Sequence, residues 1–264
     1  MLRVEQVSKT FNPGTINEKK ALDGLSLHLA PGDFVTVIGG NGAGKSTLLN
    51  AIAGTWPVDE GRIVIDGVDV TALPDFKRAK YIGRVFQDPM MGTAPDMWME
   101  ENLALAFRRG KRRGLGWGIS RAEREQYREL LQTLDLGLED RLTSKVGLLS
   151  GGQRQALTLL MATLQKPKLL LLDEHTAALD PKTAAKVLES TEKIVSRDNL
   201  TTLMITHNMR DAIAHGNRLI MMYEGRIVID VSGEEKKSLT VERLLGLFSQ
   251  VSGSDEADDK LLLG

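Results

Sequence analysis

Short apolar runs recur along the chain and are separated by turn residues or by amphipathic stretches. The runs predict strands over residues 2–7, 25–29, 34–38, 61–65, 81–86, 169–172 and 202–205. Two further runs, 219–223 and 226–230, are joined by Glu224-Gly225 and predict a terminal hairpin. Turns are predicted at Asn12-Pro13-Gly14 and at Pro31-Gly32-Asp33.

Stretches with helical periodicity lie between these predicted strands. They predict helices over 46–53, 153–164 and 181–196, and a more polar helical stretch over 97–148. Strands that alternate with helices favour a parallel sheet covered by helices, so we expect an α/β fold. A chain of 264 residues can bury a full core, and we expect one unit over 1–250 followed by a disordered acidic tail over 251–264.

Composition narrows the range of partners. Hydrophobic residues make up 42% of the chain and the formal net charge is −1, so no broad basic field indicates nucleic acid, and none is expected as a partner. Cysteine is absent, which excludes disulfides and thiolate ligands and fits a reducing cytoplasm. No apolar stretch reaches the ~18 residues of a spanning helix, so we expect other chains to cross any membrane that this protein serves.

A glycine-rich loop follows the predicted strand 34–38. The segment Gly39-Gly40-Asn41-Gly42-Ala43-Gly44-Lys45-Ser46-Thr47 fits G-x-x-x-x-G-K-[ST] and leads directly into a predicted helix. Backbone N–H groups of such a loop surround phosphate oxygens, the lysine reaches the outer phosphates, and the serine hydroxyl can bind Mg²⁺. A chance glycine turn is the alternative, and the strand-to-helix context disfavours it. The predicted nucleotide ligands are Gly39, Asn41, Gly42, Gly44, Lys45, Ser46 and Thr47.

Two adjacent acids follow the apolar run 169–172. Ligand chemistry in α/β proteins is placed at the carboxyl ends of parallel strands, where Asp173 and Glu174 would lie. We expect Asp173 to be the carboxylate on the Mg²⁺ side and Glu174 to orient or deprotonate a water that attacks the γ-phosphate. Solvated acids at a strand end are the alternative.

The segment Leu149-Ser150-Gly151-Gly152-Gln153 precedes this acidic pair. It matches the LSGGQ signature of ABC ATPases, and with it the chain resembles that family over residues 2–245. The resemblance implies a P-loop NTPase (RecA-like) core with an antiparallel β subdomain and a helical subdomain, about 90–155, inserted in the core. It also implies site roles for Gln87 as the Q-loop residue on the Mg²⁺ side, Asp180 in the D-loop, His207 as the switch histidine and Phe11 as the aromatic that stacks on adenine.

Each of these residues also has an ordinary structural interpretation. Gln87 could be a polar strand end and His207 a hydrogen-bonded histidine, but their order and spacing favour function. Phe11 could equally be part of a core, because stacking and packing both need an apolar ring. His28 and His215 have no motif around them and are interpreted as structural or solvated.

The sequence departs from the family pattern at two positions. His175 stands where the family usually has proline, and Ala156 stands where many members carry arginine. Neither removes a group with an assigned chemical role, so the departures put only the subfamily and its substrate in doubt. The surroundings of His175 show no metal-ligand spacing.

The signature provides a second phosphate-binding element. Ser150 and the following glycines begin a predicted helix and so offer a hydroxyl, backbone N–H groups and a helix dipole to an anion. The resemblance implies that Ser150, Gly151, Gly152 and Gln153 close on ATP held by a second cassette, expected to be another copy of this chain. It also implies ATP and Mg²⁺ as cofactors.

One segment suggests a surface for a partner. Residues 89–99 combine several methionines and a tryptophan with Gly and Pro breaks, which suits an adaptable docking groove, and the family contacts its membrane subunit here. A small core of the helical subdomain is the alternative. We interpret the basic run 108–113 as a solvated loop, with a patch near the membrane surface as its alternative.

The function expected from all of this is ATP hydrolysis that powers solute transport through the dimerisation of two cassettes. The expected partners are integral membrane permease subunits and a solute-binding protein, with the chain on the cytoplasmic face of the plasma membrane. The alternative is a soluble ABC ATPase without a membrane partner, but repair members carry coiled-coil arms and translation members carry two cassettes. A kinase or GTPase is disfavoured because no N-K-x-D motif is present.

Overall fold

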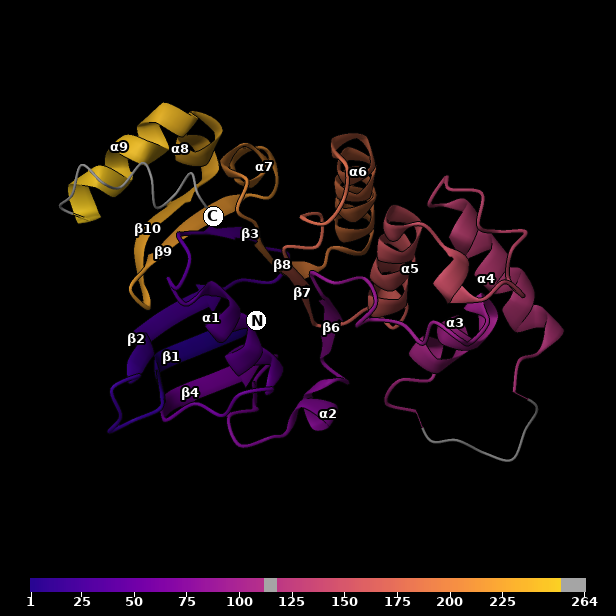
Figure 1. Ribbon diagram of the computed structural model, residues 1–264, viewed down its shortest axis with the longest axis horizontal. Coiled ribbons are helices and arrows are strands. Elements are labelled where there is room, and N and C mark those ends of the chain that lie inside the picture. Colours follow the sequence, from indigo (N-terminus) through magenta and orange to yellow (C-terminus); the bar gives the residue numbers. More distant parts are fainter. Residues whose placement is uncertain (112–117, 253–264) are drawn as a thin grey trace.

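A computed structural model describes residues 1–111 and 118–252. Two sheets form its framework (Figure 1), one four-stranded in the order β2-β1-β4-β5 and one six-stranded in the order β10-β9-β3-β8-β7-β6. The strands are β1 Leu2–Phe11, β2 Lys19–Leu29, β3 Phe34–Ile38, β4 Glu60–Ile65, β5 Val68–Asp69, β6 Ile82–Val85, β7 Leu169–Asp173, β8 Thr201–Ile205, β9 Arg218–Tyr223 and β10 Arg226–Ser232.

The helices fill the connections between the strands. They are α1 Lys45–Ala53, α2 Asp75–Arg78, α3 Met99–Phe107, α4 Arg121–Gln132, α5 Gly151–Thr163, α6 Pro181–Asp198, α7 Met209–Ala214, α8 Gly233–Lys237 and α9 Val241–Ser252, with a 3₁₀ turn at Val146–Leu148. Helices α3 and α4 pack against α5 at the opposite end of the molecule from the antiparallel sheet (Figure 1). The fold is therefore that of a P-loop NTPase core with an antiparallel β subdomain and a helical subdomain.

The central strands β3, β8 and β7 of the six-stranded sheet are buried on both faces. In β7, Leu169 and Leu171 join the core beneath α1 and the antiparallel sheet, whereas Leu170 and Leu172 join the core beneath α5 and α6. All four leucine side chains are fully buried. Burial on both faces explains why this strand is a continuous apolar run with no polar alternation. β3, β6, β7, β8 and β9 run parallel, and β10 pairs antiparallel with β9.

The structure corrects several predicted boundaries. The helical prediction over 97–148 is too broad, because α3 ends at Phe107 and α4 spans only Arg121–Gln132. β1 and β2 extend several residues beyond the predicted strands. The pairing of the two strands shifts register along these extensions, which contain polar residues. The predicted acidic tail, apart from its first two residues, lies outside the described residues, as do residues 112–117 of the predicted helical stretch.

The basic run is not simply a solvated loop. Arg108 forms an ion pair with Glu123 at 2.8 Å, and Arg109 donates to the carbonyl of Ala162 at 3.1 Å. Burial lowers the pKa of Arg109. These two arginines therefore hold α3 against α4 and α5, while Arg112 and Arg113 lie outside the part of the chain that the structure describes.

A buried arginine closes the C-terminal end of α1. Arg78 is 2% exposed, and its Nη1 donates to the carbonyls of Ala51 and Ile52 at 2.7 and 2.9 Å. Its Nε and Nη2 donate to the carbonyls of Leu73 and Thr71. The guanidinium thus satisfies helix-end carbonyls that have no partner within the helix.

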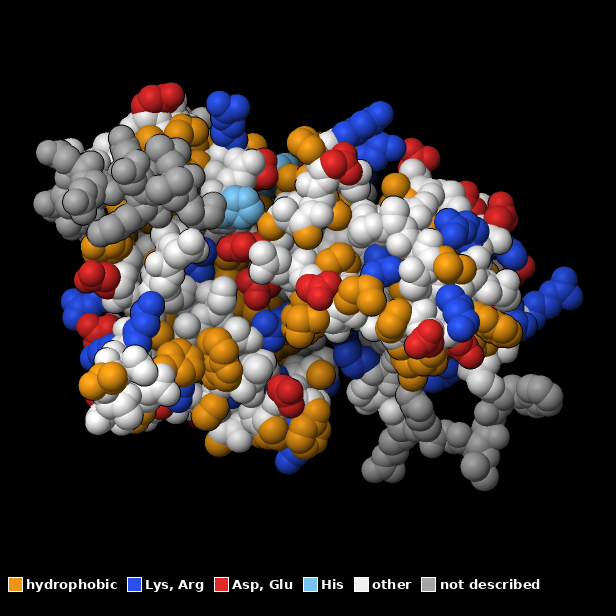
Figure 2. All heavy atoms as spheres, in the orientation of Figure 1, with side chains coloured by type: hydrophobic (Ala, Val, Ile, Leu, Met, Phe, Trp, Pro, Cys, Tyr) orange, Lys and Arg blue, Asp and Glu red, His pale blue; other side chains and the backbone are white. Residues whose placement is uncertain are grey.

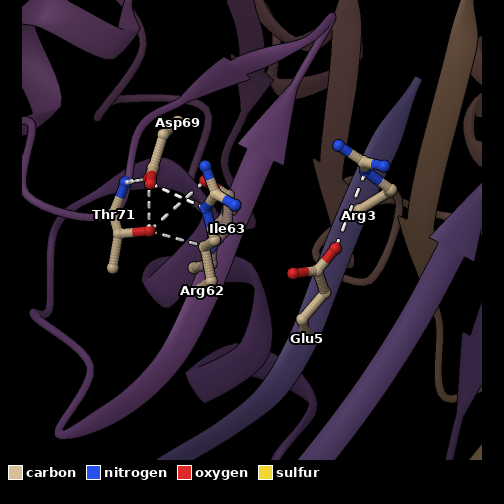
Figure 3. Close-up of polar contacts among 6 residues, drawn as sticks. All are labelled: Arg3, Glu5, Arg62, Ile63, Asp69 and Thr71. Atoms are coloured by element: carbon tan, nitrogen blue, oxygen red, sulfur yellow. Dashed lines mark hydrogen bonds and ion pairs between the residues drawn. The ribbon is translucent and has the colours of Figure 1, made fainter.

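We expect Arg78→Met to lower the free energy of unfolding by about 2–4 kcal/mol, because it leaves buried carbonyls unpaired. Urea unfolding followed by circular dichroism measures this change. Arg62→Met is the matched control: Arg62 forms an exposed pair with Asp69 (Figure 3), and its loss should change the free energy by less than about 1 kcal/mol. Equal losses in the two variants would contradict the capping role of Arg78.

Candidate nucleotide site

The glycine loop lies between β3 and α1, as the sequence predicts. Gly39 and Gly44 adopt φ values of 147° and 101°. A Cβ at Gly39 would lie 2.3 Å from the carbonyl oxygen of Met222, and one at Gly44 would lie 2.4 Å from that of Ala21. Only glycine fits these two positions, and the loop they shape leads directly into the N-terminus of α1, where backbone N–H groups can bind an anion.

Lys45 lies folded over this loop. Its side chain is buried, and Nζ donates to the carbonyls of Gly39 and Gly40 at 2.6 and 3.2 Å. Burial lowers the pKa of Lys45, whereas the nearby carboxylates of Glu174 and Asp173 raise it. A second ammonium lies against the loop, because a Cβ on Gly42 would be 2.6 Å from Nζ of Lys19. Two ammonium groups, those of Lys45 and of Lys19 on β2, therefore lie against the loop that is predicted to bind phosphates.

The two acids lie at the carboxyl end of β7. Glu174 has φ 44°, and its amide donates to the carbonyl of Ile205 at the end of β8. Its carboxylate Oε2 is 3.8 Å from Nδ1 of His207, which follows β8. Because β3, β8 and β7 are neighbours, their carboxyl ends bring the glycine loop, His207 and the acids to one edge. Figure 2 shows acidic side chains and a histidine near the middle of the viewed face.

Asp173 is partly buried beside a cation that no motif indicated. Burial raises the pKa of Asp173, and Arg84 on β6 opposes this shift. The guanidinium Nη2 of Arg84 lies 3.6 Å from Oδ2 of Asp173. Sequence reasoning missed Arg84; the available signal was a single charged residue in the otherwise apolar run Tyr81–Phe86.

A groove of about 680 Å³ opens beside these residues. It is lined by the partly buried Asp173 and Arg84 and by the exposed Gln87, Phe76 and Met91, the last two with exposed fractions of 71% and 67%. Gln87 and Asp173 therefore line the same groove, and their shared role on the Mg²⁺ side stays a prediction. Met99, by contrast, is fully buried in the core of the helical subdomain, so the core interpretation holds for Met99, while the docking interpretation of the exposed part of segment 89–99 stays a prediction.

The signature lies apart from this group. The Ser150 hydroxyl caps α5 by accepting from the amide of Gln153 at 3.3 Å, and Oε1 of Gln153 accepts from the amide of Ser150 at 3.2 Å. Within residues 1–111 and 118–252, no hydrogen bond or ion pair joins residues 150–153 to residues 39–47. The two segments predicted to bind phosphate therefore make no polar contact with each other within the described part of the chain.

Two further predicted residues make local contacts. Asp180 caps α6 by accepting from the amide of Thr183 at 3.1 Å, and hydrogen bonds from Thr183 lower the pKa of Asp180. Phe11 is partly exposed, and its ring meets that of Trp56 edge to face at a centroid distance of 5.0 Å. Phe11 therefore packs against one aromatic neighbour and keeps part of its side chain accessible.

The donors present fit Mg²⁺ held together with phosphates. Among the described residues, no group of three or more His, Asp or Glu side chains could hold a metal alone. Mg²⁺ is commonly bound by one or two carboxylates together with substrate phosphates and waters. Ser46, which is exposed at the start of α1, and Asp173 supply oxygen donors of this kind.

His175 is buried directly after Glu174. It is 2% exposed, and its Nε2 lies 3.1 Å from Oγ1 of Thr191 on α6. The Thr191 hydroxyl donates to the carbonyl of Val187, so the imidazole Nε2–H is the donor in the first contact. Burial lowers the pKa of His175 to about 4.

No helix within residues 1–111 and 118–252 has the length and apolar character needed to cross a membrane.

A family model described as "ABC transporter" matches residues 22–177. The tyrosine transport ATP-binding protein of Clostridioides difficile (strain R20291) is 47% identical over 249 residues, which cover 94% of this chain and 98% of that protein. The glycine betaine/carnitine/choline transport ATP-binding protein OpuCA of Bacillus subtilis (strain 168) is 35% identical over 86% of this chain, which spans only 57% of that relative.

Solved structures agree with these matches. A dimeric ATP-binding cassette in a post-hydrolysis state, bound to ADP and Pi, is 31% identical with a TM-score of 0.75. The match covers 88% of this chain and 98% of that one. A cassette in its ADP conformation is 28% identical with a TM-score of 0.77, and the match covers 100% of this chain.

The burial of His175 predicts a stability that falls in mild acid. Its folded pKa lies below the unfolded value of about 6.5, so stability is fully present above pH 6.5 and is lost as pH falls toward 4. Between pH 7.5 and 5.5 the linkage removes about 1 kcal/mol of unfolding free energy. Urea unfolding at the two pH values should show a smaller loss for His175→Gln than for the parent, and the same loss in both proteins would contradict this origin.

Proposed function

The chain belongs to the ABC transporter ATP-binding family, and we propose that it binds and hydrolyses ATP as one of two cassettes that drive a solute importer. The observation that carries this proposal is the separation, within one chain, of the glycine loop from the signature at Ser150. Neither element alone surrounds a nucleotide. Two copies arranged head to tail would place each signature over the nucleotide held by the other glycine loop.

In this proposal the glycine loop holds the phosphates of ATP. The amides of Gly42 and Gly44 and the N-terminus of α1 donate to phosphate oxygens, and Lys45 exchanges its two carbonyl contacts for the outer phosphates. Asn41 and Thr47 complete the loop, and Phe11 stacks on adenine. Ser46, Gln87 and Asp173 would hold Mg²⁺, which supplies positive charge to the β- and γ-phosphates when bound.

Glu174 is proposed to act on the attacking water. Its carboxylate lies one residue beyond Asp173, and His207, 3.8 Å away, is placed to orient it and to contact the γ-phosphate. Ser150, Gly151, Gly152 and Gln153 of the second cassette would close on the same phosphate, with Asp180 at the interface between cassettes. ATP then favours the closed dimer because it contacts both copies only in that state.

The groove between Gln87 and Met91 is proposed to receive an integral membrane permease. Its exposed Phe76 and Met91 provide an apolar surface in the same groove that Asp173 lines. The similarity to a protein named for tyrosine transport supports an amino acid or a similarly small organic solute as cargo. A solute-binding protein and a position on the cytoplasmic face of the plasma membrane complete the proposal.

We expect Glu174→Gln to lower ATP turnover by about 10²- to 10⁴-fold while ATP binding is retained, because the amide cannot accept a proton from water. With ATP the variant should elute as a stable dimer in size-exclusion chromatography. Glu189→Gln is the control, since Glu189 is an exposed acid on α6 paired with Lys193. Near-normal turnover by Glu174→Gln would reject the proposed role of Glu174.

Mixing two inactive variants tests whether the signature acts on the other copy. We expect Ser150→Arg and Lys45→Ala to be inactive as homodimers, since each damages both composite sites. In a heterodimer the two lesions fall in the same site and leave the other site intact, so ATPase activity should reappear on mixing. Failure of mixing to restore any hydrolysis would count against two independent composite sites.

A further inference from the structure

Arg84 is held rigidly beside the acidic pair. Its Nη2 donates to Oδ1 of Asn50 at 2.8 Å and its Nη1 to Oγ1 of Thr55 at 3.1 Å. The guanidinium carbon lies 4.5 Å from the ring centroid of Phe86. Two hydrogen bonds and one aromatic face therefore fix the plane of this cation independently of Asp173.

The same guanidinium lies between Asp173 and Asn50, which contacts the backbone of Ser46, another predicted metal ligand. On one side, Nη2 lies 3.6 Å from Oδ2 of Asp173, and both side chains are only about 15% exposed. On the other side, Asn50 accepts from Arg84 and donates through Nδ2 to the carbonyl of Ser46 at 2.8 Å. Polar contacts thus run from the backbone carbonyl of Ser46, at the start of α1, through Asn50 and Arg84 to Asp173 at the end of β7.

We propose that Arg84, clamped by Asn50, is a positioning residue that orients Asp173 for Mg²⁺; the inference rests on the proposed metal role of Asp173. The guanidinium occupies the side of Oδ2 and leaves the other carboxylate oxygen, Oδ1, for the metal or its waters. Its distance from Oδ2 exceeds that of a direct hydrogen bond, so the clamp limits rotation of the carboxylate without replacing the metal. A planar guanidinium presents separate N–H donors in a fixed geometry, so it can face Asp173 while it also donates to Asn50 and Thr55. The single nitrogen of a lysine ammonium does not reproduce this geometry.

A competing account is that Arg84 is only a cation that repels Mg²⁺. The two accounts make opposite predictions, because loss of a repelling charge strengthens metal binding and loss of an orienting partner weakens it. Loss of partners that orient metal ligands typically lowers metal affinity by about 10- to 100-fold. The sign of the change in metal affinity therefore separates them.

ADP is the probe, because it lacks the γ-phosphate and is not hydrolysed, so cassette closure does not enter the measurement. Calorimetric titration of the full chain with ADP in excess Mg²⁺ and in EDTA gives the ratio of the two affinities. We expect Arg84→Met to lower this ratio by about 10-fold and to leave the affinity in EDTA unchanged. Asn50→Leu removes the hydrogen bond that holds Arg84, so it should also lower this ratio. The variant that combines Arg84→Met with Asn50→Leu should lower the ratio little further than Arg84→Met alone.

Arg84→Lys and Arg62→Met sharpen the test. The lysine keeps the positive charge but not the fork, so we expect it to resemble Arg84→Met. Arg62→Met removes a different arginine–aspartate pair, in the antiparallel sheet (Figure 3), and should leave the ratio at the parental value. Urea unfolding of each variant confirms that the titrated protein is folded.

Four outcomes would overturn the inference. They are a raised ratio in Arg84→Met, an unchanged ratio in Arg84→Met, full retention of the ratio by Arg84→Lys, and an equal loss in Arg62→Met. Asp173→Asn distinguishes a failure of the proposed role of Arg84 from a failure of the proposed metal role of Asp173. If Asp173→Asn lowers the ratio and Arg84→Met does not, only the role of Arg84 is rejected; if Asp173→Asn has no effect, the metal role of Asp173 fails first.

Discussion

The parallel pairing of β3, β8 and β7 is the constraint on which the candidate site depends. Each of these strands is buried on both faces. A shift of one residue in the pairing of a strand would move its apolar side chains from one hydrophobic core to the other, so the register is fixed. Three loops consequently leave the sheet at the same edge. The glycine loop, the Asp173-Glu174 pair and His207 are adjacent because hydrophobic packing fixes the strands that carry them.

The charges at this edge are balanced only in part. Lys45 is buried and satisfied by two carbonyl oxygens, and Asp173 shares a fixed guanidinium with Asn50 and Thr55. The Glu174 carboxylate lies 3.8 Å from the imidazole of His207, and its charge raises the pKa of Lys45. A nucleotide with its metal would supply the missing anionic and cationic partners, so the same groups that cost folding energy in their unpaired form favour binding.

Local signals explain what could be predicted from the sequence. The glycine loop, β3 and the acidic pair could be predicted because each is a contiguous motif whose residue types are set by short-range geometry. Helix α6 could be predicted from the helical spacing of its apolar residues and from Asp180, which caps its N-terminus. Arg84 and Asn50 were not found, since their contact joins positions far apart in sequence and carries no motif. The interpretation of the basic run was wrong for Arg108 and Arg109 for the same reason: Glu123 and the carbonyl of Ala162 satisfy them only after α3, α4 and α5 have packed together.

The separation of Ser150 from the glycine loop affects the rate at which the isolated chain would hydrolyse ATP. A site divided between two copies forms only on encounter, so turnover per molecule should rise with protein concentration until all chains are paired. A membrane partner that holds two cassettes side by side raises their effective concentration to about the millimolar range. The partner would then regulate the motor simply through proximity, before any movement in the groove near Phe76 is transmitted to the nucleotide.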